Sequence, residues 1–240
     1  LNYKNVYNSQ TTFMQPRNNK GSFIENFSPD DYTPHICESN GWQYFWSVQQ
    51  DVDGLISLVG GKERFAQKLD SMFTYNPSAD EDLPIFSTGM IGQYAHGNEP
   101  SHHIIHMYNY VDQPYKTQEL VDSVLHTLYF NDPNGLSGNE DCGQMSAWYI
   151  LNAMGFYQVC PGKPIYSIGR PAFDKAVINL PEEKTFSIVV KNNEKKNKYI
   201  ESVTLNGQPL NTPFFHHQDI ANGGTMEIKM TAQPTKWGVR

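Results

Sequence analysis

Residues 42–75 decide the fold class of this chain: WQYFWSVQQDVDGLISLVGGKERFAQKLDSMFTY. Apolar residues recur in this stretch at the 3.6-residue spacing of an α-helix. Gly60 and Gly61 interrupt the pattern, and glycine is the usual residue just beyond a helix C-terminus. The pattern therefore predicts two helices, over 42–60 and 62–75, joined by a tight turn.

The same arrangement recurs further along the chain. A helix is expected over 101–110 with Ser101 as its N-cap, and a second helix follows over 115–130 after a short turn. A fifth helix is expected over 142–154, because Gly155 supplies another C-terminal signal. Long connections rich in Gly and Asn precede the helices that begin near positions 42, 101 and 142.

Helices that are antiparallel neighbours alternate in direction, so the first, third and fifth helices run the same way. The three long loops before them then lie at one end. Each loop carries acidic residues just before its helix, namely Glu38, Glu99, and the pair Glu140 and Asp141. Three distant segments are thus expected to converge on one face, as in an α/α toroid with a pocket at one end.

The apolar period changes from 3.6 to 2 after Pro161. Alternating segments at 185–192, 199–210 and 225–232 are separated by polar turns, which is typical of β-strands. The sequence therefore predicts a mainly α chain with a C-terminal β part. A helical domain over 1–160 is followed by a small antiparallel, sandwich-like domain over 161–240.

Composition narrows the class of function. The chain of 240 residues has a net charge of −7 and a pI of about 5.6, which argues against binding to nucleic acid. No apolar run approaches the roughly 20 residues that a membrane-spanning helix needs. Aromatic residues make up 13% of the chain, which suits an enzyme or a carbohydrate binder because sugars stack on aromatic rings.

The cysteines suggest neither a disulfide framework nor a zinc knuckle. Cys37, Cys142 and Cys160 are odd in number and form no CxxC motif. Each is expected to be a buried free thiol.

Two converging carboxylates, one protonated and one ionised, are the usual equipment for hydrolysis of a glycosidic bond. Trp42 and Trp148 would shape a sugar subsite, and the amides of Asn98 and Asn139 together with carboxylates suit Ca²⁺. Structural alternatives exist for both acids that begin helices. Glu38 can interact favourably with the dipole of the following helix, and Asp141 can be a simple N-cap of its helix.

A histidine-rich stretch, HGNEPSHHIIH at 96–106, raises the alternative of a transition metal. His102 and His106 are four residues apart on one helical face, a spacing that can hold zinc. However, there is no HExxH motif and no third ligand at a motif spacing. If the metal is instead Ca²⁺, which prefers oxygen ligands, His102 and His103 are expected to bind sugar hydroxyls or orient carboxylates, and His106 to be a core or supporting residue.

Read in order, five strings closely resemble the glycoside hydrolase family 92 α-mannosidases over nearly the whole chain. They are ESNGWQYFW, DVDGLISLVGG, GQYAHGNEPSHH, QELV and GNEDCGQMSAWYILNAMGFYQVCPG. The resemblance implies an N-terminal β-sandwich packed on an (α/α)₆ barrel. It also implies a Ca²⁺-dependent, inverting exo-α-mannosidase, secreted or periplasmic in bacteria that degrade N-glycans and other mannosides.

The resemblance also implies roles by motif position. Glu38 matches the general acid, Asp141 matches the general base, and Glu99 matches a residue at the sugar and calcium subsite. Asn98, His102 and His103 lie beside Glu99. Two departures occur, at Ser39, where the family often has glycine, and at Asn139, where some members carry a second acid. The latter concentrates the role of base on Asp141.

Family members are much longer than this chain, which corresponds to the C-terminal half of the barrel plus the β part. The expected partners are an α-mannoside glycan and the missing β-sandwich and barrel half. An inverting mechanism predicts that the carboxyls of Glu38 and Asp141 lie about 6.5–9.5 Å apart. Two alternatives remain, a catalytically inactive carbohydrate-binding or scaffold fragment, and a zinc hydrolase that uses His102 and His106.

Overall fold

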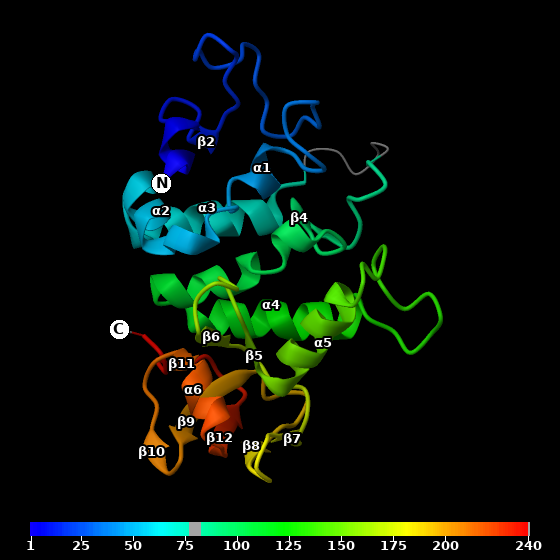
Figure 1. The fold of residues 1–240 in the computed structure, drawn as a ribbon, viewed down its shortest axis with the longest axis vertical. Helices are drawn as coiled ribbons and strands as arrows, with labels where there is room; N and C mark the ends of the chain where they lie inside the picture. The colour runs from blue at the N-terminus through cyan, green and yellow to red at the C-terminus, as the bar shows by residue number, and fades with distance from the viewer. Residues whose placement is uncertain (77–82, 240) are drawn as a thin grey trace. The chain divides into compact units, whose positions relative to one another are not determined.

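A computed structural model describes residues 1–76 and 83–239 of the chain. Its chain path divides into two compact units (Figure 1). The first unit comprises Leu1–His102 with Leu136–Asn139, and the second comprises His103–Gly135 with Glu140–Arg240.

The first unit is built from short helices and two small hairpins. In chain order its elements are η1 (Asn2–Asn5), β1 (Tyr7–Asn8), β2 (Phe13–Met14), α1 (Gly41–Tyr44), η2 (Gln49–Asp51), α2 (Val52–Val59), α3 (Lys62–Thr74), β3 (Met90–Ile91), β4 (Tyr94–Ala95) and η3 (Glu99–Ser101). Strand β1 pairs with β2, and β3 pairs with β4, both antiparallel.

The single helix predicted over 42–60 is wrong, because the chain forms α1, η2 and α2 there. Helix α1 is capped by Asn40, whose side chain accepts from the amide of Gln43 while the Gln43 side chain accepts from the amide of Asn40. Helix α2 begins afresh because the Asp51 carboxylate accepts from the amide of Gly54 at 3.1 Å. A short acidic side chain that bonds to a nearby amide favours a new N-terminus over helix continuation.

The helix predicted over 62–75 is confirmed as α3. Gly60 ends α2 in the left-handed conformation, with a φ of 97°, as the C-terminal signal predicted. Phe65, Leu69 and Met72 form the buried face of α3. Its packing extends to α1 and the following turn, because the Phe65 ring lies edge-on to Trp46 at a centroid distance of 5.2 Å.

The helices of the second unit are η4 (Ile104–Val111), α4 (Pro114–Thr127), α5 (Gln144–Met154) and the short α6 (His217–Ala221). The helix expected over 101–110 is instead a 3₁₀ helix that starts at Ile104, so Ser101 is not its N-cap. Asp112 turns the chain with a left-handed φ of 61°, and Pro114 then occupies the first turn of α4. Gly155 ends α5 as predicted, with a φ of 103°.

The β part of the second unit forms two sheets. The strands are β5 (Phe156–Tyr157), β6 (Ile165–Ile168), β7 (Lys175–Asn179), β8 (Thr185–Lys191), β9 (Tyr199–Leu205), β10 (Gln208–Pro209), β11 (Phe214–His216) and β12 (Gly224–Thr231). One sheet has the order β10-β9-β12-β8-β7 and the other β11-β6-β5. The prediction of a purely antiparallel domain is wrong in one pairing, because β12 runs parallel to β8 and antiparallel to β9.

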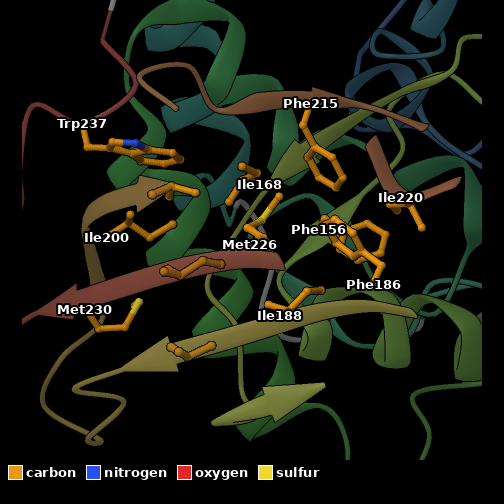
Figure 2. Close-up of a cluster of buried hydrophobic side chains, with 13 residues drawn as sticks. Phe156, Ile168, Phe186, Ile188, Ile200, Phe215, Ile220, Met226, Met230 and Trp237 are labelled. Atoms are coloured by element: carbon orange, nitrogen blue, oxygen red, sulfur yellow. The ribbon is translucent and has the colours of Figure 1, made fainter. Parts of the chain in front are cut away.

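A single hydrophobic core lies between these strands (Figure 2). Alternate residues of β8 and β12 supply it, so that Met226 pairs with Ile188 in the parallel ladder. The smaller sheet contributes Phe156 and Phe215, whose rings meet edge-on at 5.5 Å. Because both sheets bury their apolar side chains in one cluster, they stabilise each other.

Helix α4 joins this β part. The side-chain oxygen of Gln118 accepts from the amide of Ile200 in β9 at 2.9 Å. The mostly buried carboxylate of Asp122 pairs with Arg170 at 3.2 Å and with Lys198 at 3.0 Å. The predicted order of a helical part followed by a C-terminal β part is thus confirmed. The half toroid, and the domain boundary after residue 160, stay predictions.

Candidate functional site

Glu38 lies on an exposed loop just before α1. Its backbone is left-handed, with a φ of 51°, which is uncommon for a residue with a side chain. The side-chain amide of Asn98 donates to the backbone carbonyl of Glu38 at 2.9 Å. Asn98 itself is buried, so this hydrogen bond fixes the loop from the inside while the Glu38 side chain reaches solvent.

A third segment packs against the residue before Asn98. A Cβ atom on Gly97 would lie 2.1 Å from the backbone oxygen of Ser137, so no other residue fits there without displacing the backbone. The hydroxyl of Thr88 donates to that same oxygen at 2.9 Å. The segment 136–139, which ends in the exposed Asn139, is thereby held against Gly97.

Within the first unit the segments at Glu38, Asn98 and Asn139 lie together, which confirms the predicted convergence for the loops that carry Glu38 and Glu99. Glu140 and Asp141 belong to the second unit, so their part in the convergence stays a prediction. Helix α1 also contacts η3, whose first residue is the half-buried Glu99. A buried hydrogen bond of 2.8 Å from Asn40 to Gln93 links the start of α1 to the residue before β4. Glycine and amide contacts thus position this loop cluster.

Trp42 lies in the first turn of α1 and is half-buried. Its indole N–H donates to Asp30 at 2.8 Å, and its ring lies 5.3 Å from that of Tyr75. The hydroxyl of Tyr75 donates to the other oxygen of the same carboxylate at 3.1 Å. The indole is consequently held in one orientation.

The predicted calcium ligands are oxygen donors of the type that Ca²⁺ prefers. Because the Asn98 nitrogen donates to Glu38, its side-chain oxygen points away from that hydrogen bond. The next residue, Glu99, supplies a carboxylate. Within residues 1–76 and 83–239, no group of three His, Cys, Asp or Glu side chains is placed to hold a metal ion. The two residues therefore fit calcium in chemistry but make only a partial ligand set.

Behind these residues lies a buried chain of side-chain hydrogen bonds. The Tyr94 hydroxyl bonds to Nδ1 of His96 at 2.8 Å, and Nε2 of His102 donates to the His96 carbonyl at 2.9 Å. Burial lowers the pKa of His96 to about 2, and the proximity of His102 adds to the effect. Burial also lowers the pKa of His102 to about 4. Both imidazoles are therefore neutral at pH 7 and support the loop at Asn98.

His106 belongs to the core of the second unit, as one reading of the sequence predicted. Its Nε2 donates to the side-chain oxygen of Asn152 at 2.8 Å, and its Nδ1 bonds to the Ser167 hydroxyl at 3.1 Å. Asn109 donates to the same hydroxyl at 2.6 Å, which directs the Ser167 proton to the ring. The only lone pair of the neutral ring is thus engaged, and the zinc alternative lacks a ligand at this position.

Asp141 lies in the second unit and is exposed, with a left-handed φ of 54°. Its alternative role as N-cap of α5 is wrong, because the cap position is Gly143. Glu140 serves the helix N-terminus instead, since its carboxylate accepts from the amides of Gly143 and Ser146. Hydrogen bonds from Ser146 and Gly143 lower the pKa of Glu140. The Glu140 carboxylate is thus used at the N-terminus of α5, whereas the Asp141 side chain is exposed to solvent.

Two further predicted sugar contacts are buried. Trp148 is fully buried in α5, where its ring stacks on Tyr129 at a centroid distance of 5.9 Å. His103 is also buried, at the start of η4. The prediction of buried cysteines is wrong, because Cys37 and Cys142 are exposed and Cys160 is half-buried. The exposed thiols lie directly beside Glu38 and Asp141 in the sequence.

The capping roles of Asn40 and Glu140 were not predicted from the sequence. The signal for Asn40 was present, because a glutamine follows it by three residues, which is the spacing of a capping box. The role of Glu140 was harder to read. It acts across three left-handed residues, Asp141, Cys142 and Gly143, and no standard spacing rule covers that geometry.

Comparison with known proteins agrees with the motifs. The sequence profile of the Glycosyl hydrolase family 92 catalytic domain matches residues 1–232. A protein of Arthroderma benhamiae, named an uncharacterized secreted glycosidase, is 26% identical over 99% of this chain and 32% of its own length. The described part of the chain contains no helix long and apolar enough to cross a membrane.

Solved structures of the same family are also similar to this chain. A family GH92 α-mannosidase from Bacteroides thetaiotaomicron is similar over 100% of this chain and 32% of its own, with a TM-score of 0.92 and 36% identity. A family GH92 inverting mannosidase from the same organism is similar over 100% of this chain and 34% of its own, with a TM-score of 0.88 and 37% identity. The chain thus spans about a third of the length of these relatives. It belongs to glycosyl hydrolase family 92.

Proposed function

We propose that this chain forms the part of an inverting exo-α-mannosidase that carries both catalytic carboxylates. The observation that supports it most is the convergence at Asn98, where a buried amide holds the loop of an exposed glutamate in a member of this family. Solved relatives are named as α-mannosidases, and one is named as an inverting mannosidase. The substrate is a glycan with a terminal α-linked mannose.

Glu38 acts as the general acid. Its exposed carboxyl group donates a proton to the oxygen that leaves with the aglycone, and the bond from that oxygen to the anomeric carbon breaks. The fixed loop supports this role, because a catalytic group must be held to within a fraction of an ångström of its productive position. The contact from Asn98 is made to the backbone of Glu38 and not to its carboxyl group.

Asp141 acts as the general base. It removes a proton from the water that attacks the anomeric carbon on the opposite face of the ring, so the product is β-mannose. Its exposure, and the use of Glu140 for the N-terminus of α5, support the assignment. Asp141 follows Asn139 by two residues in the sequence, and Asn139 ends the segment held at Gly97.

Ca²⁺ is the proposed cofactor, with the Asn98 oxygen and the Glu99 carboxylate among its ligands. Bound calcium would supply a fixed positive charge for sugar hydroxyls. Trp42 is the proposed apolar wall of the sugar subsite. His102 and His96, both neutral, keep the loop of Asn98 in place. Secretion is proposed from the Arthroderma benhamiae relative that is named as secreted.

An NMR time course of α-mannobiose with the purified chain tests the proposal, in excess Ca²⁺ and in EDTA. β-Mannose that appears first, and only with Ca²⁺, is the expected result. α-Mannose as the first product would refute inversion. Turnover that persists in EDTA would refute the calcium assignment.

A binding measurement separates the inactive-fragment alternative. Mannoimidazole is the bound ligand of one solved relative, so it is a suitable probe. If α-mannobiose is not cleaved but mannoimidazole binds, the chain is a carbohydrate-binding fragment of the enzyme. If neither occurs, the proposal for this chain fails. Glu38→Gln, with Glu25→Gln as an exposed control, then shows whether any turnover depends on the proposed acid.

A further inference from the structure

A cavity of about 640 Å³ lies within the first unit. The β1–β2 hairpin, the start of α1, the end of α2 and one face of α3 form its walls. Its size falls in the range of about 300–1,000 Å³ that is usual for small-molecule sites. Of the residues proposed for the mannosidase function, Trp42 lines this cavity, whereas Glu38, Asn98 and Glu99 do not. The proposed mannosidase function therefore does not explain the two cations in its wall, Arg64 and Lys68.

Lys68 is the most unusual group in this cavity. Its Nζ lies 3.4 Å from the ring centre of Phe13 and 4.5 Å from that of Phe45, with Trp42 at 5.5 Å. Burial lowers the pKa of the amine to about 7. Within residues 1–76 and 83–239, no carboxylate forms an ion pair with Lys68. Aromatic faces therefore provide the only compensation for its charge, and they provide it weakly.

A second cation stands one helical turn away. Arg64 precedes Lys68 by four residues on α3, so the two side chains lie on the same face. Both border the cavity, and the residues that line it, all in the described part of the chain, include no Asp or Glu. Two neighbouring cations without an anion leave a positive potential inside the cavity.

Hydroxyl groups also line the cavity. Tyr7, Ser9 and Thr12 come from the β1–β2 hairpin and Ser71 comes from α3. Thr12 is left-handed, with a φ of 59°, although a β-branched residue strongly disfavours that region. A hydrogen bond of 2.7 Å from its amide to the Asn8 carbonyl holds it there. Strain of this kind often marks a binding loop.

We propose that this cavity binds a small organic anion, with a phosphate or carboxylate group between Arg64 and Lys68 and an attached ring against Trp42. The planar guanidinium suits two-point contact with either anion. The hairpin hydroxyls provide further donors for its oxygens. The anion supplies the negative charge that the walls of the cavity lack.

Isothermal titration calorimetry on the 240-residue chain at pH 6.5 tests the proposal with four probes. Phenyl phosphate and benzoate carry both a ring and an anion, and they distinguish the two anionic groups. Inorganic phosphate carries the anion only, and benzyl alcohol carries the ring only. We expect at least one of the first two to bind more tightly than either of the partial probes. Equal binding of benzyl alcohol, or no binding of either ring-bearing anion, would overturn the proposal.

Variants locate the site. Lys68→Met preserves the packed stem, and Arg64→Gln changes an exposed side chain. Each is expected to weaken binding of the ring-bearing anion about tenfold, the usual effect of losing one charge-assisted hydrogen bond. Lys62→Gln, on the same helix but outside the cavity, should leave affinity unchanged. Unchanged affinity in Arg64→Gln would refute the site even if Lys68→Met failed to fold.

The dependence on pH gives a readout that a merely structural lysine would not produce. Benzenesulfonate keeps one charge between pH 6 and 9, so only the protein titrates. Its affinity should fall about tenfold over this range as Lys68 loses its proton, because the anion favours the protonated amine. The fall should vanish in Lys68→Met. α-Mannobiose turnover, measured in parallel, should be the same in Lys68→Met as in the parent, which separates this site from the proposed mannosidase function.

Discussion

Glu38 and Asp141, about a hundred positions apart in the sequence, share one backbone conformation: both are left-handed, with φ values of 51° and 54°. Cys142 follows at 57°. A residue with a Cβ atom pays about 1–2 kcal/mol in this region. Strained backbone therefore occurs at both proposed catalytic carboxylates, where the need to present a side chain can outweigh local stability.

Substitutions at Asp141 should separate this strain from the chemistry. Asparagine tolerates the left-handed region nearly as well as aspartate, so Asp141→Asn should preserve the melting temperature. Asp141→Ala should lower the free energy of unfolding by about 1 kcal/mol, because alanine lacks a polar side chain that bonds locally. Both should lower turnover of α-mannobiose at least a hundredfold through loss of the base. Asp31→Ala, at an exposed position with ordinary backbone, is the control for thermal melting and should change neither quantity.

Glu140 should behave in the opposite way to its neighbour. Its carboxylate accepts from the amides of Gly143 and Ser146 at the start of α5, so Glu140→Ala should lower the melting temperature. Glu140→Gln keeps an acceptor and should lose less. Hydrogen bonding lowers the pKa of Glu140 in the folded state, so its contribution is present above the ordinary value of 4.5 and is lost as the pH falls below it. A melting temperature of Glu140→Ala equal to that of the parent at pH 7 would contradict this role.

Asn98→Asp tests whether Asn98 positions Glu38 or only binds metal. The aspartate keeps an oxygen for Ca²⁺ but cannot donate to the Glu38 carbonyl, so the loop should be released. We expect turnover of α-mannobiose to fall about tenfold or more while Ca²⁺ affinity is kept or raised. Asn134→Asp, on an exposed loop, is the matched control. Loss of Ca²⁺ affinity with an unchanged maximal rate in saturating Ca²⁺ would assign Asn98 to the metal alone.

The buried histidines should make the protein sensitive to mild acid. The pKa values of His96, His102 and His106 are lowered from 6.5 to about 2, 4 and 4 respectively, with burial as the main cause. Protonation thus favours the unfolded state, so stability is complete above pH 6.5 and falls as the pH decreases toward 4. Each histidine can contribute about 1.4 kcal/mol per pH unit in that window.

Thermal melting between pH 7 and 5 measures this effect while most carboxylates stay ionised. The melting temperature should fall steadily over this range. His35→Gln removes an exposed histidine and should leave the slope unchanged. His106→Gln should flatten the slope at some loss of stability. A melting temperature that does not vary with pH would show that these rings are not buried in solution.

Sequence patterns predicted the parts of this fold that depend on regular periods. Helix α3 and the strands β8, β9 and β12 appear where alternating or helical apolar spacing is strong. The patterns failed where a side chain competes with the main chain. Asp51 starts a new helix inside a stretch with continuous helical spacing, and no period reveals that competition.

For the candidate site, the sequence predicted which loops lie together but not which side chains are buried. The long loops before three helices of the same direction predicted that Glu38, Glu99, and the pair Glu140 and Asp141 would converge. The structure bears this out for the loops of Glu38 and Glu99. The motifs did not reveal which of their side chains would be buried. Trp148 belongs to the GNEDCGQMSAW motif and was predicted to contact sugar, but its side chain lies in the core. The parallel pairing of β12 with β8 depends on contacts between strands far apart in the sequence, and alternation along one strand cannot specify its neighbour.

That pairing bears on how the protein is made. Strand β12 lies in the middle of its sheet, between β9 and β8, although it is synthesised after both. Until the ribosome has released it, β8 and β9 each expose an unsatisfied edge, and the apolar cluster lacks Met226, Ile228 and Met230. The β part must therefore close late, through contacts of long sequence separation, which slows folding. During that interval the nascent chain is most exposed to aggregation, and we expect it to depend on chaperones.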